Sequence, residues 1–127
     1  MAALGTTLGS YVANPAMLET NKTAAYTVTA AENGTLFTTG TGAVTFTLPT
    51  IAAGLCYEFL NLVDADMAIA SAGSLDNIIL FNDASADSAT FGTSAKKIGA
   101  YCRVRSNSAG DKWYFENLNQ GCTVTVA

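Results

Sequence analysis

The 127-residue sequence contains no histidine, and only 13% of its residues are charged, about half the usual share in globular proteins. Without histidine, no Ser/His or Cys/His catalytic pair can form. Six basic residues against ten acidic ones give a net charge of −4, which argues against a nucleic-acid partner. No polar cluster takes the place of the missing histidine, so we expect a protein that is not an enzyme and uses no cofactor.

Long apolar runs and closely spaced cysteines are also missing. No apolar run reaches the length of about 18 residues that a membrane span needs, and the first residues lack the basic region of a signal peptide. The three cysteines, Cys56, Cys102 and Cys122, are widely spaced, so we expect small hydrophobic side chains on strand faces and no zinc site. This pattern suits a protein made in a reducing cytoplasm.

Aspartates are the remaining candidates for a metal site. Asp64 and Asp66 follow a segment with strand character, and Asp83 and Asp87 lie among small residues. The Asp-x-Asp pair lacks the following ligands and the glycine of a calcium loop. We therefore interpret all four as solvated turn residues and predict no metal site.

The stretch 42–63 has the clearest pattern in the sequence. Every second residue from Val44 to Leu48 is apolar, which is typical of a half-buried strand, and Pro49, which has no amide hydrogen, ends it. After a short loop, a second strand would turn apolar residues between Leu55 and Val63 to one face and Glu58 to the other. This stretch predicts two strands of the core.

Other segments of strand length occur at short intervals, at 26–30, 35–38, 67–71, 78–82, 98–106, 111–117 and 121–126. Asn33-Gly34 is a signal for a two-residue hairpin, whereas 83–92 has the composition of a loop. No segment shows helical periodicity over three turns. We therefore predict an all-β fold, a compact antiparallel sandwich or barrel of about eight to ten short strands, with Trp113 as the largest core residue.

Residues 1–22 differ from the rest of the chain. Leu4, Leu8, Tyr11 and Leu18 are spaced among small and polar residues without a clear period. We interpret this segment as an extended N-terminal arm whose apolar residues bind a partner, and residues 23–127 as a single β domain. The alternative interpretation is a frayed terminus.

Four of the six basic residues gather within ten positions, at Lys96, Lys97, Arg103 and Arg105. On a strand, Arg103 and Arg105 would share one face with Tyr101, and such a patch is a candidate contact for an acidic partner. The alternative is an ordinary solvated strand face. The cluster is too small to bind nucleic acid.

Three short motifs resemble a recurrent module of tailed bacteriophages. They are Leu48-Pro49 at a strand end, Gly54-Leu-Cys-Tyr57-Glu-Phe59, and Lys112-Trp113-Tyr114 after a glycine turn. The module occurs in trimeric capsid decoration (cement) proteins and in some fibre proteins. The resemblance covers about residues 26–117 and implies an all-β fold, a homotrimer and attachment to a virion surface. Cys56 departs from the polar residue usual in the module.

From this resemblance we expect a virion structural protein that decorates a bacteriophage capsid and clamps neighbouring subunits of the major capsid protein. Binding only the assembled lattice would stabilise it by mass action, and three linked contacts would raise avidity. The alternative is a tail-fibre or receptor-binding tip whose loops at 83–97 bind a host surface glycan beside Phe91 and Tyr101. A fibre usually carries an elongated stalk, which favours decoration for this chain.

Overall fold

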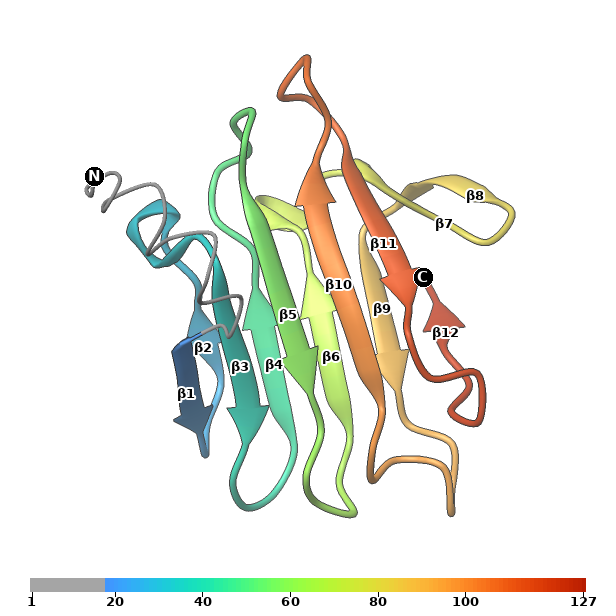
Figure 1. Ribbon diagram of the computed structural model, residues 1–127. Helices are drawn as coiled ribbons and strands as arrows, with labels where there is room; N and C mark the ends of the chain where they lie inside the picture. The colour runs from blue at the N-terminus through green and yellow to red at the C-terminus, as the bar shows by residue number, and fades with distance from the viewer. Residues whose placement is uncertain (1–17) are drawn as a thin grey trace, which may run out of the picture.

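The computed structural model describes residues 18–127, which form a sandwich of two β-sheets (Figure 1). The seven-stranded sheet has the order β1-β3-β5-β10-β11-β7-β8, with bounds Leu18–Lys22, Thr35–Thr39, Cys56–Leu60, Tyr101–Ser106, Trp113–Asn117, Ile78–Leu80 and Asp83–Ala86. The five-stranded sheet has the order β12-β9-β6-β4-β2, with bounds Thr125–Val126, Ser88–Phe91, Met67–Ala70, Val44–Thr47 and Tyr26–Thr27. Among residues 18–127 the only helical turns are η2 (Ala30–Glu32) and η3 (Ala72–Ser74). The all-β prediction is confirmed.

The two sheets are mixed rather than antiparallel. From β1 to β6 the chain alternates between them, so that β1, β3 and β5 run parallel in one sheet and β2, β4 and β6 run parallel in the other. This part of the fold is a stack of three flattened coils, each giving one strand to each sheet. Leu18 lies beside Thr35 and Val44 lies beside Met67, so one coil takes 17 to 23 residues. The described residues hold twelve strands, against the eight to ten predicted.

The predicted hairpin at Asn33-Gly34 is wrong, because β2 and β3 belong to different sheets. Gly34, with φ of +86°, turns the chain from η2 into β3 and donates its amide to the Cys56 carbonyl over 2.8 Å. The Asn33 side chain bonds the Gly54 carbonyl and the Cys56 amide. The dipeptide therefore links successive coils instead of closing a hairpin.

After β6 most pairings are antiparallel, with β10 beside β5 and β9 beside β6, but β7 runs parallel to β11. The predicted loop at 83–92 is wrong, because this segment contains β8 and β9. Its alanines suit the interior where large side chains already fill the core, and Ala86 and Ala89 are fully buried. Ile98, expected on the buried face of a strand, is 63% exposed because β10 begins only at Tyr101.

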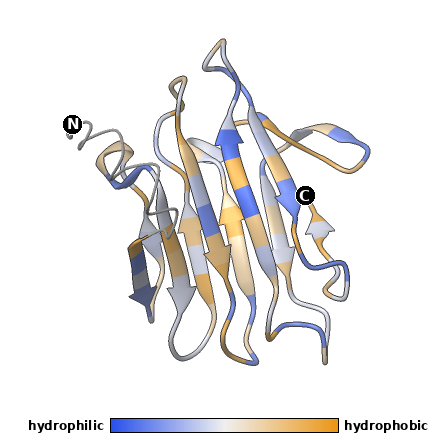
Figure 2. Ribbon diagram, in the orientation of Figure 1, coloured by the Kyte–Doolittle hydropathy of each residue, from blue (hydrophilic) through white to orange (hydrophobic). Residues whose placement is uncertain are grey.

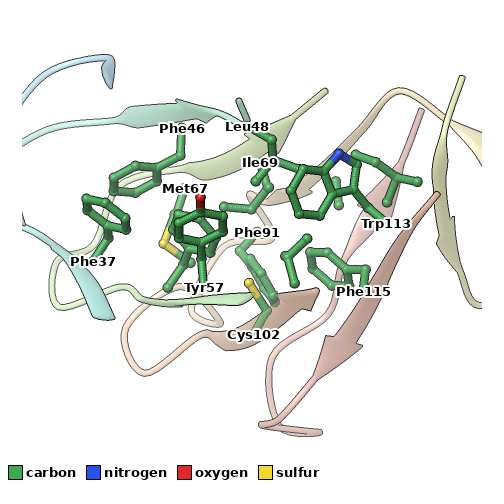
Figure 3. Close-up of a cluster of buried hydrophobic side chains, with 14 of the residues drawn as sticks. Phe37, Phe46, Leu48, Tyr57, Met67, Ile69, Phe91, Cys102, Trp113 and Phe115 are labelled. Carbon is green, nitrogen blue, oxygen red and sulfur yellow. The ribbon is translucent and has the colours of Figure 1, made fainter. Parts of the chain in front are cut away.

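The core lies between the sheets and contains most of the alternating residues of the 42–63 stretch, as predicted (Figure 3). Val63, predicted on the same face, is only half-buried because β5 ends at Leu60. The rings of Phe37, Phe46 and Phe59 pack with centroids 4.9 to 5.6 Å apart. Trp113 is buried, as predicted, with its ring 6.3 Å from that of Tyr57. Such aromatic contacts add to the stabilisation from burial and hold the two sheets at a defined separation. The outer faces are therefore set on a rigid support.

Candidate interaction surface

Polar side chains gather on the outer face of the seven-stranded sheet. Strand alternation turns Tyr57 and Val104 into the core and their neighbours Glu58 and Arg103 outward. The strand register places Arg103 between Glu58 on β5 and Glu116 on β11. We call these three residues the charged row. Figure 2 shows that the middle strands of this sheet carry hydrophilic bands among hydrophobic ones.

Arg103 and Glu58 form the tightest pair of the charged row. The Arg103 Nε and Nη2 atoms each lie 3.0 Å from Glu58 Oε2, and the Tyr101 hydroxyl donates to Glu58 Oε1. Glu58 is only 8% exposed, so its carboxylate is almost removed from water with both oxygens bonded. The hydrogen bond to Glu58 raises the pKa of Tyr101, and it also raises the pKa of Arg103.

Glu116 is held by longer contacts. Its Oε1 atom is buried without a hydrogen bond, and it lies 3.8 Å from Arg103 Nη1 and 3.7 Å from Arg105 Nε. Two arginines and two glutamates therefore balance one another across the face, and the predicted basic strand is locally neutral. Among residues 18–127, Glu116 is the one acidic side chain within ion-pair distance of Arg105. The Arg105 side chain is exposed, so its remaining N–H groups are free to donate to a ligand.

A second row lies beside the charged row and is more apolar. The register sets Arg105 between Cys56 and Tyr114, and Tyr114 beside Ile79 of β7. Tyrosine and arginine are enriched at the centres of protein interfaces, where lysine is depleted. Burial raises the pKa of the Cys56 thiol, so Cys56 contributes surface rather than a reactive thiolate. We call the charged row and this second row together the outer-face surface.

The structure brings Tyr101, Arg103 and Arg105 together on this surface, as the sequence predicts. It adds residues that sequence reasoning gave no role, namely Glu58, Glu116, Tyr114, Ile79 and Cys56. Alternation along each strand predicts that these side chains point outward. It does not predict which of them are neighbours, because that depends on the register between strands, and Arg103 and Glu58 are 45 positions apart in the chain. Lys97 lies elsewhere and pairs with Asp66 at 2.8 Å.

Of the predicted arm contacts, Leu4, Leu8 and Tyr11 lie outside the described residues. Leu18 begins β1, the edge strand of the seven-stranded sheet, and is 75% exposed. The next residues of the predicted arm are tied to the domain, because Glu19 and Asn21 both bond the Thr38 hydroxyl. Residues 18–22 are therefore part of the sheet.

Other features bear on the class of function. Within residues 18–127 no three His, Cys, Asp or Glu side chains gather as a metal site, and no helix there is long and apolar enough to cross a membrane.

Phe91, expected beside a glycan, is fully buried and stacks on Phe115 with centroids 6.2 Å apart. Comparisons with protein-family models, curated proteins and solved structures found no match.

Proposed function

We propose that this protein is a non-enzymatic virion structural protein that decorates a bacteriophage capsid and stabilises it by clamping neighbouring major capsid subunits. The motif resemblance over residues 26–117 supports the proposal. The observation that carries it is the outer-face surface, a sheet face with paired charges and an accessible Arg105 beside Tyr114. The protein would then be found on the capsid surface of the virion.

The charge arrangement suits burial against a large partner. Charged groups oppose interface formation when they lose water without gaining a partner. Arg103 and Glu58 already bond each other. When a partner covers them, their mutual contact compensates for most of the hydration that the two charges lose. Arg105 and Tyr114 remain to make new contacts, and residues of these two types often carry most of the binding free energy.

We further propose a homotrimer, which would present three copies of the outer-face surface to the lattice. Linked contacts raise overall affinity by effective concentration, so each contact can be weak alone. Binding to the assembled capsid and not to free subunits shifts the assembly equilibrium by mass action. The stabilisation then needs no covalent step and no cofactor.

The N-terminal arm is a second anchor in this proposal, with Leu4, Leu8 and Tyr11 packing on a capsid or sister subunit. An extended chain covers at most about 3.3–3.6 Å per residue, so a segment of this length reaches a neighbouring subunit. Deleting residues 2–17 tests the arm without removing β1, whose Glu19 and Asn21 bond Thr38. Retained folding with lost particle binding supports the anchor. Undiminished binding leaves the outer-face surface as the contact.

The central experiment measures where the protein goes in purified virions. Decoration requires hundreds of copies that co-purify with capsids, and we expect Tyr114→Ala with Arg105→Ala to reduce this number. Thr45→Ala is the matched control, since Thr45 is an exposed strand residue on the opposite sheet. Equal binding of the control and the double variant would contradict the role of the outer-face surface.

The alternative function is a tail-fibre or receptor-binding tip that binds a host glycan. It predicts a few copies that co-purify with tails rather than hundreds with capsids. The burial of Phe91 removes one of the two aromatic residues on which this alternative was based. Tyr101 remains, with its hydroxyl bonded to Glu58. If the protein co-purifies with tails, the tail-fibre function is supported and capsid decoration is contradicted.

A further inference from the structure

The one Asn-Gly dipeptide of the sequence lies in a surface turn between η2 and β3. Asn33 has φ and ψ of −50° and 133°, and Gly34 has φ of +86°. These angles are close to those of a type II turn, in which glycine takes the left-handed position. Both residues are exposed, so water reaches the dipeptide.

An Asn-Gly dipeptide can react with itself and with water. Asparagine is a thermolabile residue, and glycine after it has no side chain to shield the next backbone nitrogen. The Gly34 nitrogen attacks Asn33 Cγ and forms an N–Cγ bond, while its amide proton passes to a base in the solvent. The Cγ–Nδ2 bond breaks, and Nδ2 takes up a proton and leaves as ammonia. Water then opens the resulting succinimide ring at either carbonyl, which yields aspartate or isoaspartate.

Three hydrogen bonds, which we call the coil link, hold the dipeptide against the next coil. The Gly34 amide donates to the Cys56 carbonyl over 2.8 Å, so the attacking nitrogen keeps its proton. Asn33 Nδ2 donates to the Gly54 carbonyl over 2.9 Å, and Asn33 Oδ1 accepts from the Cys56 amide over 2.7 Å. These bonds hold the Asn33 side chain toward the next coil and away from its own backbone.

The backbone of Asn33 also opposes the reaction. Closure of the succinimide ring requires the Gly34 nitrogen and Asn33 Cβ to be nearly eclipsed about the Cα–C bond. The extended ψ of 133° does not bring them together. The chain must therefore rotate at Asn33, and this rotation breaks the coil link.

We propose that Asn33 is a latent deamidation site, closed while the coil link is intact and reactive toward water when the link opens. Such local openings occur without global unfolding. The product cannot restore the link, because a carboxylate oxygen replaces Nδ2 beside the Gly54 carbonyl and leaves two acceptors facing each other. The reaction therefore loosens the start of β5 permanently, two positions before Glu58. This modification does not depend on the proposed decoration of capsids.

The first test compares the folded and the unfolded chain. The full-length protein is incubated at mildly alkaline pH with and without guanidinium chloride. Peptide mass spectrometry measures deamidation at Asn33, and isoaspartate methyltransferase labels the isoaspartate product. We expect the folded protein to react at least roughly tenfold more slowly, because the coil link must open first. Equal rates in the two states would overturn the proposal.

Two glycine variants separate opening of the coil link from global unfolding. Gly54 and Gly42 have φ of +82° and +73°, and a Cβ at either position would meet no atom within 4 Å, so alanine strains the backbone similarly at both. Gly54 supplies a carbonyl to the coil link, whereas Gly42 lies in the turn between β3 and β4.

In the folded Gly54→Ala variant we expect Asn33 to deamidate roughly tenfold faster than in wild type, because opening of the link releases the left-handed strain. Gly42→Ala is the matched control and should react at the wild-type rate. Equal acceleration in both variants would show that the site reacts only through global unfolding. That result, or an unchanged rate in Gly54→Ala, would overturn the proposal.

Asn33→Asp tests whether the aspartate product can restore the coil link. We expect hydrogen exchange at the Gly34 and Cys56 amides, the backbone donors of the link, to become roughly tenfold faster while β10 stays protected. Asn82→Asp is the matched control, since it adds the same charge at an exposed residue in the turn between β7 and β8. Unchanged exchange at both amides in Asn33→Asp would show that the link reforms and would overturn the permanent loosening.

Discussion

Arg103 on β10 donates from Nε to Glu58 Oε2 on β5 over 3.0 Å, and its Nη2 atom lies at the same distance from the same oxygen. The two residues are 45 positions apart in the chain, so only the pairing of β10 with β5 brings them together. The pair joins β5, the last strand of the coil stack in this sheet, to β10. It thereby couples the integrity of the outer-face surface to correct strand register.

Substitution of Glu58 by glutamine should destabilise the protein. Glu58→Gln keeps the volume but removes the charge that Arg103 and Tyr101 share, and hydrogen bonds to charged groups contribute about 1.5–3 kcal/mol. We expect a loss within that range in urea unfolding. Glu116→Gln is the control, since its contacts of 3.7 and 3.8 Å are too long for hydrogen bonds, and it should cost less than about 1 kcal/mol. Equal losses of unfolding free energy in the two variants would show that Glu58 contributes no more to stability than Glu116.

Alkaline pH should destabilise the fold through its buried tyrosine. Burial raises the pKa of Tyr57 from 10.0 to about 12, so the folded state favours the protonated phenol. The associated stability is complete below pH 10 and is lost as pH rises toward 12. We expect the urea midpoint of wild type to fall across this window and that of Tyr57→Phe to fall less. Parallel pH profiles for the two proteins would exclude this cause.

Truncation of Trp113 should have a large effect on stability. Trp113→Ala leaves a cavity between the sheets beside Tyr57, and such changes cost about 3–5 kcal/mol. Tyr114→Ala removes the next side chain, which is exposed, and should change stability by about 0.5 kcal/mol or less. Thermal melts of both variants compare core with surface on the same strand. A small shift for Trp113→Ala would mean that the core repacks around the gap.

A methyl group at Gly40 should release β1 from the sheet. The Gly40 amide donates to the Lys22 carbonyl over 2.7 Å, and a Cβ at this position would come within 2.7 Å of Asn21 Oδ1 and closer still to Thr23 Cγ2. We expect Gly40→Ala to speed amide exchange in β1 while β10 stays protected. Adding Thr23→Ala should restore part of the protection. Uniformly faster exchange would show a global rather than a local effect.

The sequence was most informative where one strand could be analysed alone. Alternation identified the buried faces of β4, β5 and β10, because the side-chain period of a strand is independent of its partners. It failed at 83–92, where small residues looked like a loop although tertiary packing makes them strands. It also failed at Asn33-Gly34, whose local hairpin preference is overridden by bonds to Gly54 and Cys56 of the next coil.

The candidate surface was predictable only in part. The residues Tyr101, Arg103 and Arg105 follow from a single strand, and the sequence placed them on one face. Their neutralisation by Glu58 and Glu116 depends on which strands pair. β10 runs antiparallel to both β5 and β11, and its pairing with β5 joins residues 45 positions apart, which no local pattern indicates. The predicted strand segment 78–82 was too long, because β7 ends at Leu80 and Phe81 adopts a left-handed backbone in the turn that follows.

Because the first six strands form a stack of coils, one whole coil is the unit by which the fold could be lengthened without disturbing its other strands. Neighbouring strands lie about 4.7–4.9 Å apart, so duplicating one coil of 17 to 23 residues would widen both sheets by that distance at once. The alternation of every later strand would be unchanged, because a whole coil returns the chain to the same sheet and face. A single inserted residue within β3 or β5 would instead invert the faces beyond it. The width of this sandwich can therefore change in whole-coil steps while Glu58, Arg103 and Glu116 keep their neighbours.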